Sequence, residues 1–159
     1  RAEASCLDDW RIYGDIFFMP FIKAIRLGDF PGQAECLEYM LGALAPDMPA
    51  ETLSDLKEAV YLREDTASTY LEDGLAVPHG RISGLGAEYV VAGISSGGVD
   101  WPTEDCRANL VILVAVDRSR VAAYLSILQK IIKWRKSLGG SAAGISPEEM
   151  ARGLELALN

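Results

Sequence analysis

Apolar side chains recur at intervals of three and four residues in four stretches of the chain, which is the spacing of amphipathic helices. The positions expected to face the core are Ala34, Leu37, Met40, Leu41 and Leu44; Leu53, Leu56 and Val60, whose stripe can extend to Arg63; Val121, Leu125, Leu128, Ile131 or Ile132 and Trp134; and Met150, Leu154 and Leu158. Asp117 or Ser119 is expected to cap the third helix, and Gly139-Gly140 to end it. Ser146-Pro147-Glu148-Glu149 predicts a capping box for the fourth.

Four further runs of apolar residues lack this helical spacing and predict strands. They span residues 15–26, 75–77, 89–94 and 110–116. Ser95-Ser96-Gly97-Gly98 is expected to form a loop between the last two. Because the final run is apolar on both faces, helices must cover the sheet on both sides. The order of elements therefore predicts one α/β domain over residues 1–159, a three-layer α/β/α sandwich with a mixed central sheet flanked by helices.

The net charge of −8 and the half-hydrophobic composition are those of a folded, acidic domain. Such a surface repels nucleic acids and anionic membrane faces, so we expect neither as a partner. No apolar stretch approaches the ~20 residues that span a bilayer, and no signal peptide is recognisable, which predicts a cytoplasmic protein. The sequence begins at Arg1 rather than Met, which is consistent with a piece excised from a longer transporter or regulator.

The three cysteines, Cys6, Cys36 and Cys106, are widely spaced and form no CxxC pair. With one histidine in the whole chain, they offer little for a zinc site. We therefore expect reduced thiols, as in a cytosolic protein, and neither a metal nor a bound cofactor.

The one histidine, His79, lies in the segment Gly74-Leu75-Ala76-Val77-Pro78-His79-Gly80. The apolar run is expected to carry the imidazole to the end of a strand, because Pro78 lacks an N–H and should end the pairing there. Gly80 should leave space beside the ring. A lone histidine is more often a structural or surface residue than a reactive one, so its position alone does not establish a function.

The order of motifs around His79 resembles the IIA domains of the fructose–mannitol type. These type 2 domains, which include the nitrogen-regulatory IIA proteins, belong to the bacterial phosphoenolpyruvate-dependent sugar phosphotransferase system. The shared pattern is Arg63-Glu64, then Ser68-Thr69, then a glycine-containing loop before Val77-Pro78-His79-Gly80. Gly98-Val99-Asp100-Trp101 matches a short turn that precedes a buried strand in these domains. The resemblance covers about residues 33–158.

The resemblance implies that His79 accepts a phosphoryl group from the carrier protein HPr and passes it to a IIB component. A neutral imidazole suits this role, since its ordinary pKa of ~6.5 leaves the ring largely uncharged at cytosolic pH. By the same resemblance, Arg63 would hold phosphoryl oxygens and Thr69 would donate its hydroxyl to them. From residue type alone, Arg63 is equally an arginine that pairs with Glu64 or Asp65, and Thr69 a loop-capping residue.

The chain also departs from the family pattern. Tyr124 stands where many members have a second histidine, and its hydroxyl can bond the imidazole or a phosphate without supplying a positive charge. The loop before His79 is poor in glycine, and its Glu72 and Asp73 would oppose phosphorylation if they faced the site, although an outward orientation fits a turn better. Arg81 is a weaker phosphate candidate. Two other readings therefore stay open: a regulatory module that controls a transporter, kinase or transcription regulator through the phosphorylation state of His79, and a purely structural domain.

Overall fold

The computed structural model describes residues 19–102, 106–140 and 142–159, so Cys6 and the first part of the predicted strand at 15–26 lie outside the described residues. The elements in chain order are β1 (Phe21–Arg26), α2 (Gln33–Gly42), α3 (Ala50–Thr66), β2 (Leu75–Ala76), β3 (His79–Ile82), β4 (Tyr89–Trp101), β5 (Cys106–Asp117), α4 (Val121–Leu138) and α5 (Pro147–Leu158), with short 3-10 turns at Ala45–Asp47 and Ala142–Gly144. This is the predicted order of strands and helices, with one addition: the predicted strand at 75–77 is followed by a second short strand, β3.

The strands form one mixed sheet in the order β1-β4-β5-β2, and β3 also pairs with β5. β1 runs parallel to β4, β4 runs antiparallel to β5, and β2 and β3 both run parallel to β5. The two short strands follow each other along one edge of β5: Leu75 lies opposite Leu110, and His79 lies opposite Val114. The two strands on either side of Val77-Pro78, including the one that begins at His79, are therefore both paired with β5.

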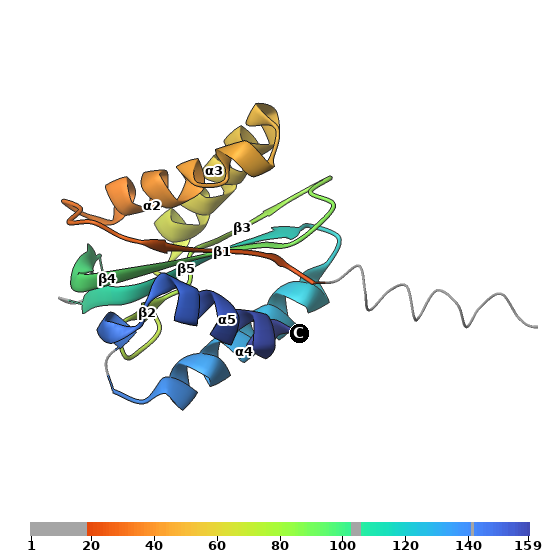
Figure 1. The fold of residues 1–159 in the computed structure, drawn as a ribbon. Helices are drawn as coiled ribbons and strands as arrows, with labels where there is room; N and C mark the ends of the chain where they lie inside the picture. Colours follow the sequence, from red (N-terminus) through yellow and green to blue (C-terminus); the bar gives the residue numbers. More distant parts are fainter. Residues whose placement is uncertain (1–18, 103–105, 141) are drawn as a thin grey trace, which may run out of the picture.

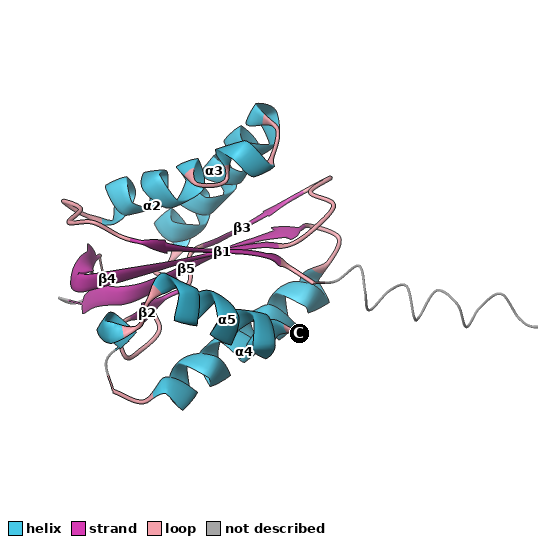
Figure 2. Cartoon of the chain, in the orientation of Figure 1, coloured by secondary structure: helices cyan, strands magenta, loops and turns pink. Residues whose placement is uncertain are grey.

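The helices cover both faces of this sheet, α2 and α3 on one side and α4 and α5 on the other (Figure 1 and Figure 2). Successive residues of β5 point into two separate cores, with Val111 and Leu113 on the α2–α3 side and Leu110 and Ile112 on the α4–α5 side. Residues 110–116 are all buried, as expected of a strand covered on both faces. The predicted three-layer α/β/α sandwich with a mixed central sheet is confirmed.

Most of the predicted helix stripes and caps are confirmed, but Ala34 is exposed, and Cys36 faces the core from the first turn of α2. The inward residues of α2, α3 and α5 are Cys36, Leu37, Met40 and Leu41; Leu53, Leu56 and Val60; and Met150, Leu154 and Leu158. Ser146 and Glu149 form the capping box of α5, and α4 ends before Gly139. The buried Cys36 thiol has its pKa raised to about 12 by desolvation, so it is an unreactive core residue. None of the helices in the described ranges is long and apolar enough to cross a membrane.

The predicted stripe of α4 is wrong over its first turns. Val121 and Leu125 are 46% and 51% exposed, whereas Ile127 and Ile131 are buried. The apolar positions of this helix are compatible with more than one rotation about its axis, and packing against the sheet and α5 selects the one that buries Ile127, Ile131 and Trp134. As a result, Val121 and Leu125 face a pocket instead of the core.

The predicted loop at Ser95-Ser96-Gly97-Gly98 is also wrong, because β4 continues through it to Trp101. The pairing with β5 shifts register between Ile94 and Val99, so the segment is an irregularity inside a strand pair. Gly98 has φ of 76°, which glycine adopts without strain. The turn expected at Gly98–Trp101 from the family resemblance is likewise part of β4.

The backbone at Val77-Pro78 changes the expected setting of His79. Pairing stops after Ala76, but it resumes at His79, which is the first residue of β3 and not the last residue of a strand. The carbonyl of Pro78 accepts a hydrogen bond from the N–H of Val114 at 2.9 Å. Because Pro78 has only to accept a hydrogen bond at this position, it can lie between two strands without separating the chain from β5.

Close packing against α3 requires a glycine at position 80. The sequence instead suggested that Gly80 leaves space for the imidazole ring. A Cβ at this position would lie 3.0 Å from Leu56 Cδ1 and 3.0 Å from Val60 Cγ2. We expect Gly80→Ala to lower the free energy of unfolding by about 1–3 kcal/mol, because β3 and α3 would have to separate. Urea denaturation measures this, with Gly42→Ala as the control because nothing lies within 4 Å of a Cβ there. Equal stability of the two variants would contradict the packing argument.

Candidate functional site

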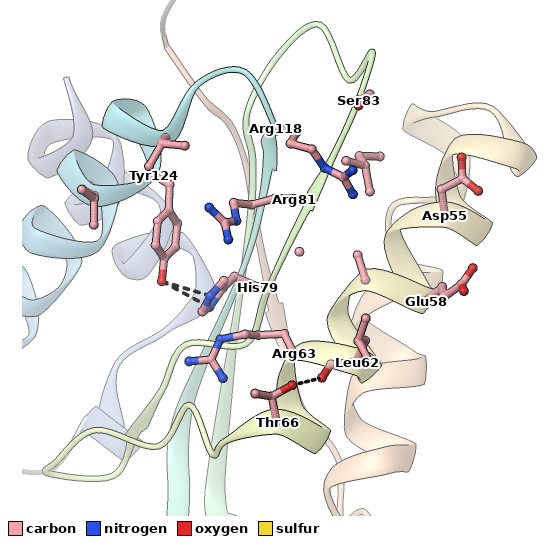
Figure 3. Close-up of a pocket in the computed structure, with 15 residues that line it drawn as sticks. Asp55, Glu58, Leu62, Arg63, Thr66, His79, Arg81, Ser83, Arg118 and Tyr124 are labelled. Atoms are coloured by element: carbon pink, nitrogen blue, oxygen red, sulfur yellow. Dashed lines mark hydrogen bonds between the residues drawn. The ribbon is translucent and has the colours of Figure 1, made fainter.

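A pocket of about 1140 Å³ opens between α3 and the start of α4, with β3 between them (Figure 3). Its charged lining residues are Arg63, Arg81, Arg118, Asp55 and Glu58, and its exposed apolar ones are Leu62, Val121 and Leu125. His79 and Tyr124 lie together at one end, and Asp55 and Glu58 lie at the other (Figure 3). The pocket therefore combines one nucleophile, several cations and an apolar rim.

His79 is held in one orientation by the backbone. The ring is 7% exposed, and its Nδ1 lies 3.0 Å from the carbonyl oxygen of Val77. A carbonyl oxygen can only accept, so Nδ1 must carry the proton and donate it. Nε2 is then the ring nitrogen with the available lone pair. The structure thus decides between the two nitrogens, which the sequence leaves open.

Tyr124 stacks on the imidazole. The two ring centroids are 4.6 Å apart with an interplanar angle of 34°, and the hydroxyl lies 3.1 Å from Nε2 and 3.4 Å from Nδ1. An atom on the axis of the Nε2 lone pair would be much farther from Nδ1 than from Nε2. The nearly equal distances therefore place the hydroxyl over the face of the ring, and the in-plane lone pair of Nε2 stays uncovered. Burial raises the pKa of Tyr124, so its hydroxyl keeps its proton.

The pKa of His79 is lowered from its ordinary value. Burial of the ring is the largest cause, the hydrogen bond to Val77 opposes it, and the charges of Arg63 and Arg81 lower it further. Each of the lowering effects favours the neutral imidazole, which is the form with a lone pair to donate. The ring therefore stays a nucleophile at mildly acidic pH, where a solvated histidine takes up a proton.

We expect an NMR titration of the imidazole C–H signals to give His79 a pKa below 6.5, and Arg81→Ala to raise it. Because the unfolded chain titrates at the ordinary value, the folded state should lose stability as pH falls through about 6.5, where only the unfolded chain takes up the proton. Arg152→Ala, an exposed change on α5, is the control and should leave the value unchanged. A pKa at or above 6.5 would contradict the burial argument.

Arg63 lies in the last turn of α3 and lines the pocket beside His79 (Figure 3). Its Nη1 donates to the carbonyl of Ala67 at 2.6 Å. The ion pair with Glu64 or Asp65 that its residue type allowed does not occur within the described residues, because Glu64 instead accepts hydrogen bonds from Gln33 and Thr69. The guanidinium is therefore placed in the pocket with donors left for an anion.

Thr69 is not brought into the pocket. It is 4% exposed, and its hydroxyl donates to a carboxylate oxygen of Glu64. The threonine that does line the pocket, Thr66, donates its own hydroxyl to the carbonyl of Leu62 at 2.9 Å. Neither hydroxyl has a proton left for a bound phosphate in this arrangement.

Two further cations line the pocket, Arg81 on β3 and Arg118 on the turn between β5 and α4. The sequence marked Arg81 as a weak candidate and missed Arg118, because nothing in its local pattern connects it with His79. The register of β3 on β5 supplies that connection: the N–H of Arg118 donates to the carbonyl of Ile82 at 2.7 Å. The exposed rim residues Val121 and Leu125 were missed for a related reason, since they were assigned to the core.

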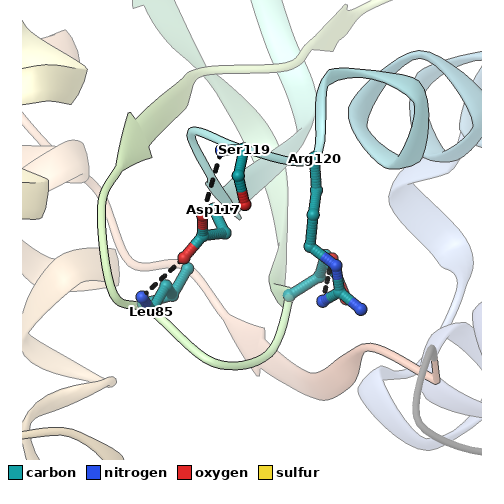
Figure 4. Close-up of polar contacts among 5 residues, drawn as sticks. Leu85, Asp117, Ser119 and Arg120 are labelled. Atoms are coloured by element: carbon teal, nitrogen blue, oxygen red, sulfur yellow. Dashed lines mark hydrogen bonds and ion pairs between the residues drawn. The ribbon is translucent and has the colours of Figure 1, made fainter.

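The turn that carries Arg118 is held by several side-chain hydrogen bonds and an ion pair (Figure 4). Asp117 accepts from the hydroxyl of Ser119 at 2.7 Å and from the N–H groups of Ser119 and Leu85 at 3.0 and 2.9 Å, and these bonds lower its pKa to about 2. Arg120 pairs with the buried Glu88 at 2.7 Å. The sequence predicted that Asp117 or Ser119 caps α4, and this prediction is wrong. Asp117 stabilises the turn instead, and Arg120 is the N-cap residue. The turn therefore fixes the start of the helix that carries Tyr124.

The acidic residues Glu72 and Asp73 do not face His79. Glu72 is paired with Lys136 at 3.4 Å, and both acids line a separate, smaller pocket beside α4. Asp73 has φ of 54°, a turn conformation that aspartate tolerates better than most residues. Their outward orientation is confirmed, so they do not oppose an anion at His79. Within the described residues, no group of three or more His, Cys, Asp or Glu side chains is placed to hold a metal ion.

Comparison with known proteins agrees with the fold. Residues 23–137 match the model of the family described as phosphoenolpyruvate-dependent sugar phosphotransferase system, EIIA 2. The chain belongs to this family. The match begins ten residues earlier than the resemblance noted from the sequence, at β1, and ends with α4.

Solved structures of type 2 IIA proteins share the fold. Nitrogen regulatory protein IIA-Ntr from Neisseria meningitidis aligns with a TM-score of 0.63 at 20% identity, over 93% of this chain and 99% of that one. IIA mannitol from Escherichia coli aligns with a TM-score of 0.57 at 24% identity, over 84% and 94%. A complex of enzyme IIA mannitol with phosphorylated enzyme IIB mannitol from Escherichia coli aligns with a TM-score of 0.52 at 21% identity, over 82% and 98%.

Proposed function

We propose that this chain is a cytoplasmic phosphocarrier domain, working as one unit over residues 1–159 alone or within a longer protein. His79 accepts a phosphoryl group from the phosphohistidine of HPr and passes it to a IIB component. The observation that carries the proposal is the state of the imidazole. It is buried and neutral, its Nδ1–H is committed to Val77, and its Nε2 lone pair lies uncovered in a pocket with Arg63 and Arg81.

The transfer step balances without a cofactor. The Nε2 lone pair of His79 attacks the phosphorus, the phosphorus–nitrogen bond of the donor breaks, and its electron pair returns to the donor imidazole. The Nδ1 proton of His79 stays on its bond to the Val77 carbonyl, which offsets the charge that develops on the ring. Positioning and neutralisation of the phosphoryl charge are then the main tasks of the protein.

We assign three supporting roles. Arg63 neutralises the transferring phosphoryl oxygens with its paired donors. Tyr124, whose hydroxyl lies over Nε2, donates to a phosphoryl oxygen once the group is attached there. Thr69 acts indirectly: its bond to Glu64 holds the chain that follows α3 in place beside Arg63. In this assignment Thr69 is a positioning residue and does not touch the phosphoryl group.

A second candidate function is regulatory, with phosphorylation of His79 switching a contact to a transporter, kinase or transcription regulator. The observation in its favour is Tyr124, which supplies no positive charge where many relatives have a histidine, together with the likeness to a IIA-Ntr structure. The likeness to IIA mannitol, and to its complex with phosphorylated IIB, supports the transport role. The exposed Leu62, Val121 and Leu125 around the pocket suit a protein partner in either case.

The test is phosphoryl uptake by the intact chain. We expect incubation with phosphoenolpyruvate, enzyme I and HPr to add one phosphoryl group, seen as a single mass increase. No increase would overturn the proposal. Adding IIB proteins to the phosphorylated chain then separates the two candidates: discharge to a IIB protein supports the carrier role, and a stable phosphoprotein that no IIB discharges supports the regulatory role.

A further inference from the structure

We infer that the pocket contains a second anion-binding subsite, built on Arg118 and Arg81, and that it binds a small molecule with two linked phosphate groups without any covalent step. One phosphate would take the place beside His79, between Arg63 and Arg81, and the other would lie between Arg81 and Arg118. This binding goes beyond phosphoryl transfer, because it requires neither HPr nor a phosphorylated His79.

The three arginines are arranged in a row along the pocket and not in a ring around His79. The guanidinium groups of Arg63 and Arg81 lie on either side of His79, and Arg118 lies beyond Arg81, farther from the imidazole (Figure 3). The pKa of His79 agrees with this order, since the arginine charges that lower it are those of Arg63 and Arg81. Arg118 is therefore poorly placed to help a phosphoryl group on Nε2, and a role for it needs a second anionic group.

Among the described residues, none of the three arginines has an ion-pair partner, although other arginines of the chain, such as Arg107, are paired. Three cations thus stand in one concave site of a protein whose net charge is −8. Unpaired guanidinium groups that share a pocket repel one another, and a bound polyanion relieves this repulsion.

The pocket has room for a small molecule that carries more than one anionic group. Its volume of about 1140 Å³ lies slightly above the usual range of ligand pockets and exceeds what one phosphoryl group fills. Leu62 and Leu125 are exposed at its rim and can pack on the part of the ligand that carries no charge. Asp55 and Glu58 line the end away from His79, so the ligand should not extend a further negative charge in that direction.

Calorimetric titration of the unphosphorylated chain with inorganic pyrophosphate and inorganic phosphate tests the inference. We expect pyrophosphate to bind about tenfold more tightly than phosphate, the effect of one added charge-assisted contact. Arg118→Ala should remove this advantage, Arg118→Lys should keep part of it, and Asp55→Asn should strengthen pyrophosphate binding. Arg152→Ala on α5 is the matched control and should change nothing. Circular dichroism checks that each variant is folded, and Arg118→Gln replaces Arg118→Ala if the alanine variant is not.

Equal affinities for the two anions would overturn the inference, and so would a pyrophosphate preference that survives removal of the Arg118 charge. The result is independent of the proposed function. A chain that accepts a phosphoryl group but shows no pyrophosphate preference has the carrier site without the second subsite. A chain that binds pyrophosphate through Arg118 but is never phosphorylated has the subsite without the carrier function.

Discussion

Replacing His79 by glutamine should abolish phosphoryl uptake from phosphorylated HPr, with a loss of more than roughly 10³-fold in rate. Glutamine removes the only group in the pocket with a nucleophilic nitrogen lone pair, since its amide nitrogen is not nucleophilic. It is a better choice than alanine, because its N–H can still reach the Val77 carbonyl that Nδ1 now satisfies at 3.0 Å. Alanine would leave that carbonyl without a partner, at a cost of about 1–3 kcal/mol if it stays buried.

The measurement is the intact mass of the variant after incubation with the complete phosphorylating system. Its control is the unfolding midpoint, which should stay close to that of the original chain. A folded glutamine variant that still gains a phosphoryl group would show that another residue is the acceptor, and the assignment of His79 would be wrong.

Replacing Arg63 by alanine should slow phosphoryl uptake roughly 10²-fold, the typical effect of removing one preorganised donor to a developing charge. The guanidinium lies beside His79 and has no carboxylate partner among the described residues, so its charge is available to the phosphoryl oxygens. Arg63→Lys should be intermediate, because lysine keeps the charge but loses the paired donors.

Rapid-quench measurement of the transfer rate checks this prediction. Arg26→Ala, a loss of charge at the exposed end of β1, serves as the control and should transfer at the original rate. If Arg63→Ala and Arg26→Ala were equally active, the charge of Arg63 would have no specific role, and the arginine would be a structural residue that binds the Ala67 carbonyl.

The parts of the fold that the sequence predicted well are those decided by local pattern. The apolar run at Leu110–Val116 indicated a strand buried on both faces, and from that followed the three layers. The capping box at Ser146 and Glu149 is a short-range device and was predicted residue by residue. His79 was singled out because it is the only histidine of the sequence and because the motifs around it resemble the family pattern.

What the sequence did not predict depends on packing between distant segments. The rotation of α4, which exposes Val121 and Leu125, is set by α5 and the sheet and not by the helix alone. Arg118 joins the site only because β3 lies beside β5. Thr69 was expected to reach a phosphate, but its hydroxyl has a nearer acceptor in Glu64, near the end of α3. In each case the residue type indicated which contacts the side chain can make, but the sequence did not predict which residues lie beside it in the fold.

The central claim is that Nε2 of His79 carries the phosphoryl group, and NMR of the phosphorylated chain with ¹⁵N-labelled histidine tests it most directly. With a single histidine in the sequence, the imidazole signals need no assignment to a residue, only to one of the two ring nitrogens. We predict phosphorus coupling to Nε2, with the Nδ1 proton retained on its bond to Val77. Phosphorus coupling to Nδ1, or an unmodified imidazole in a chain that has gained phosphoryl mass, would contradict the account.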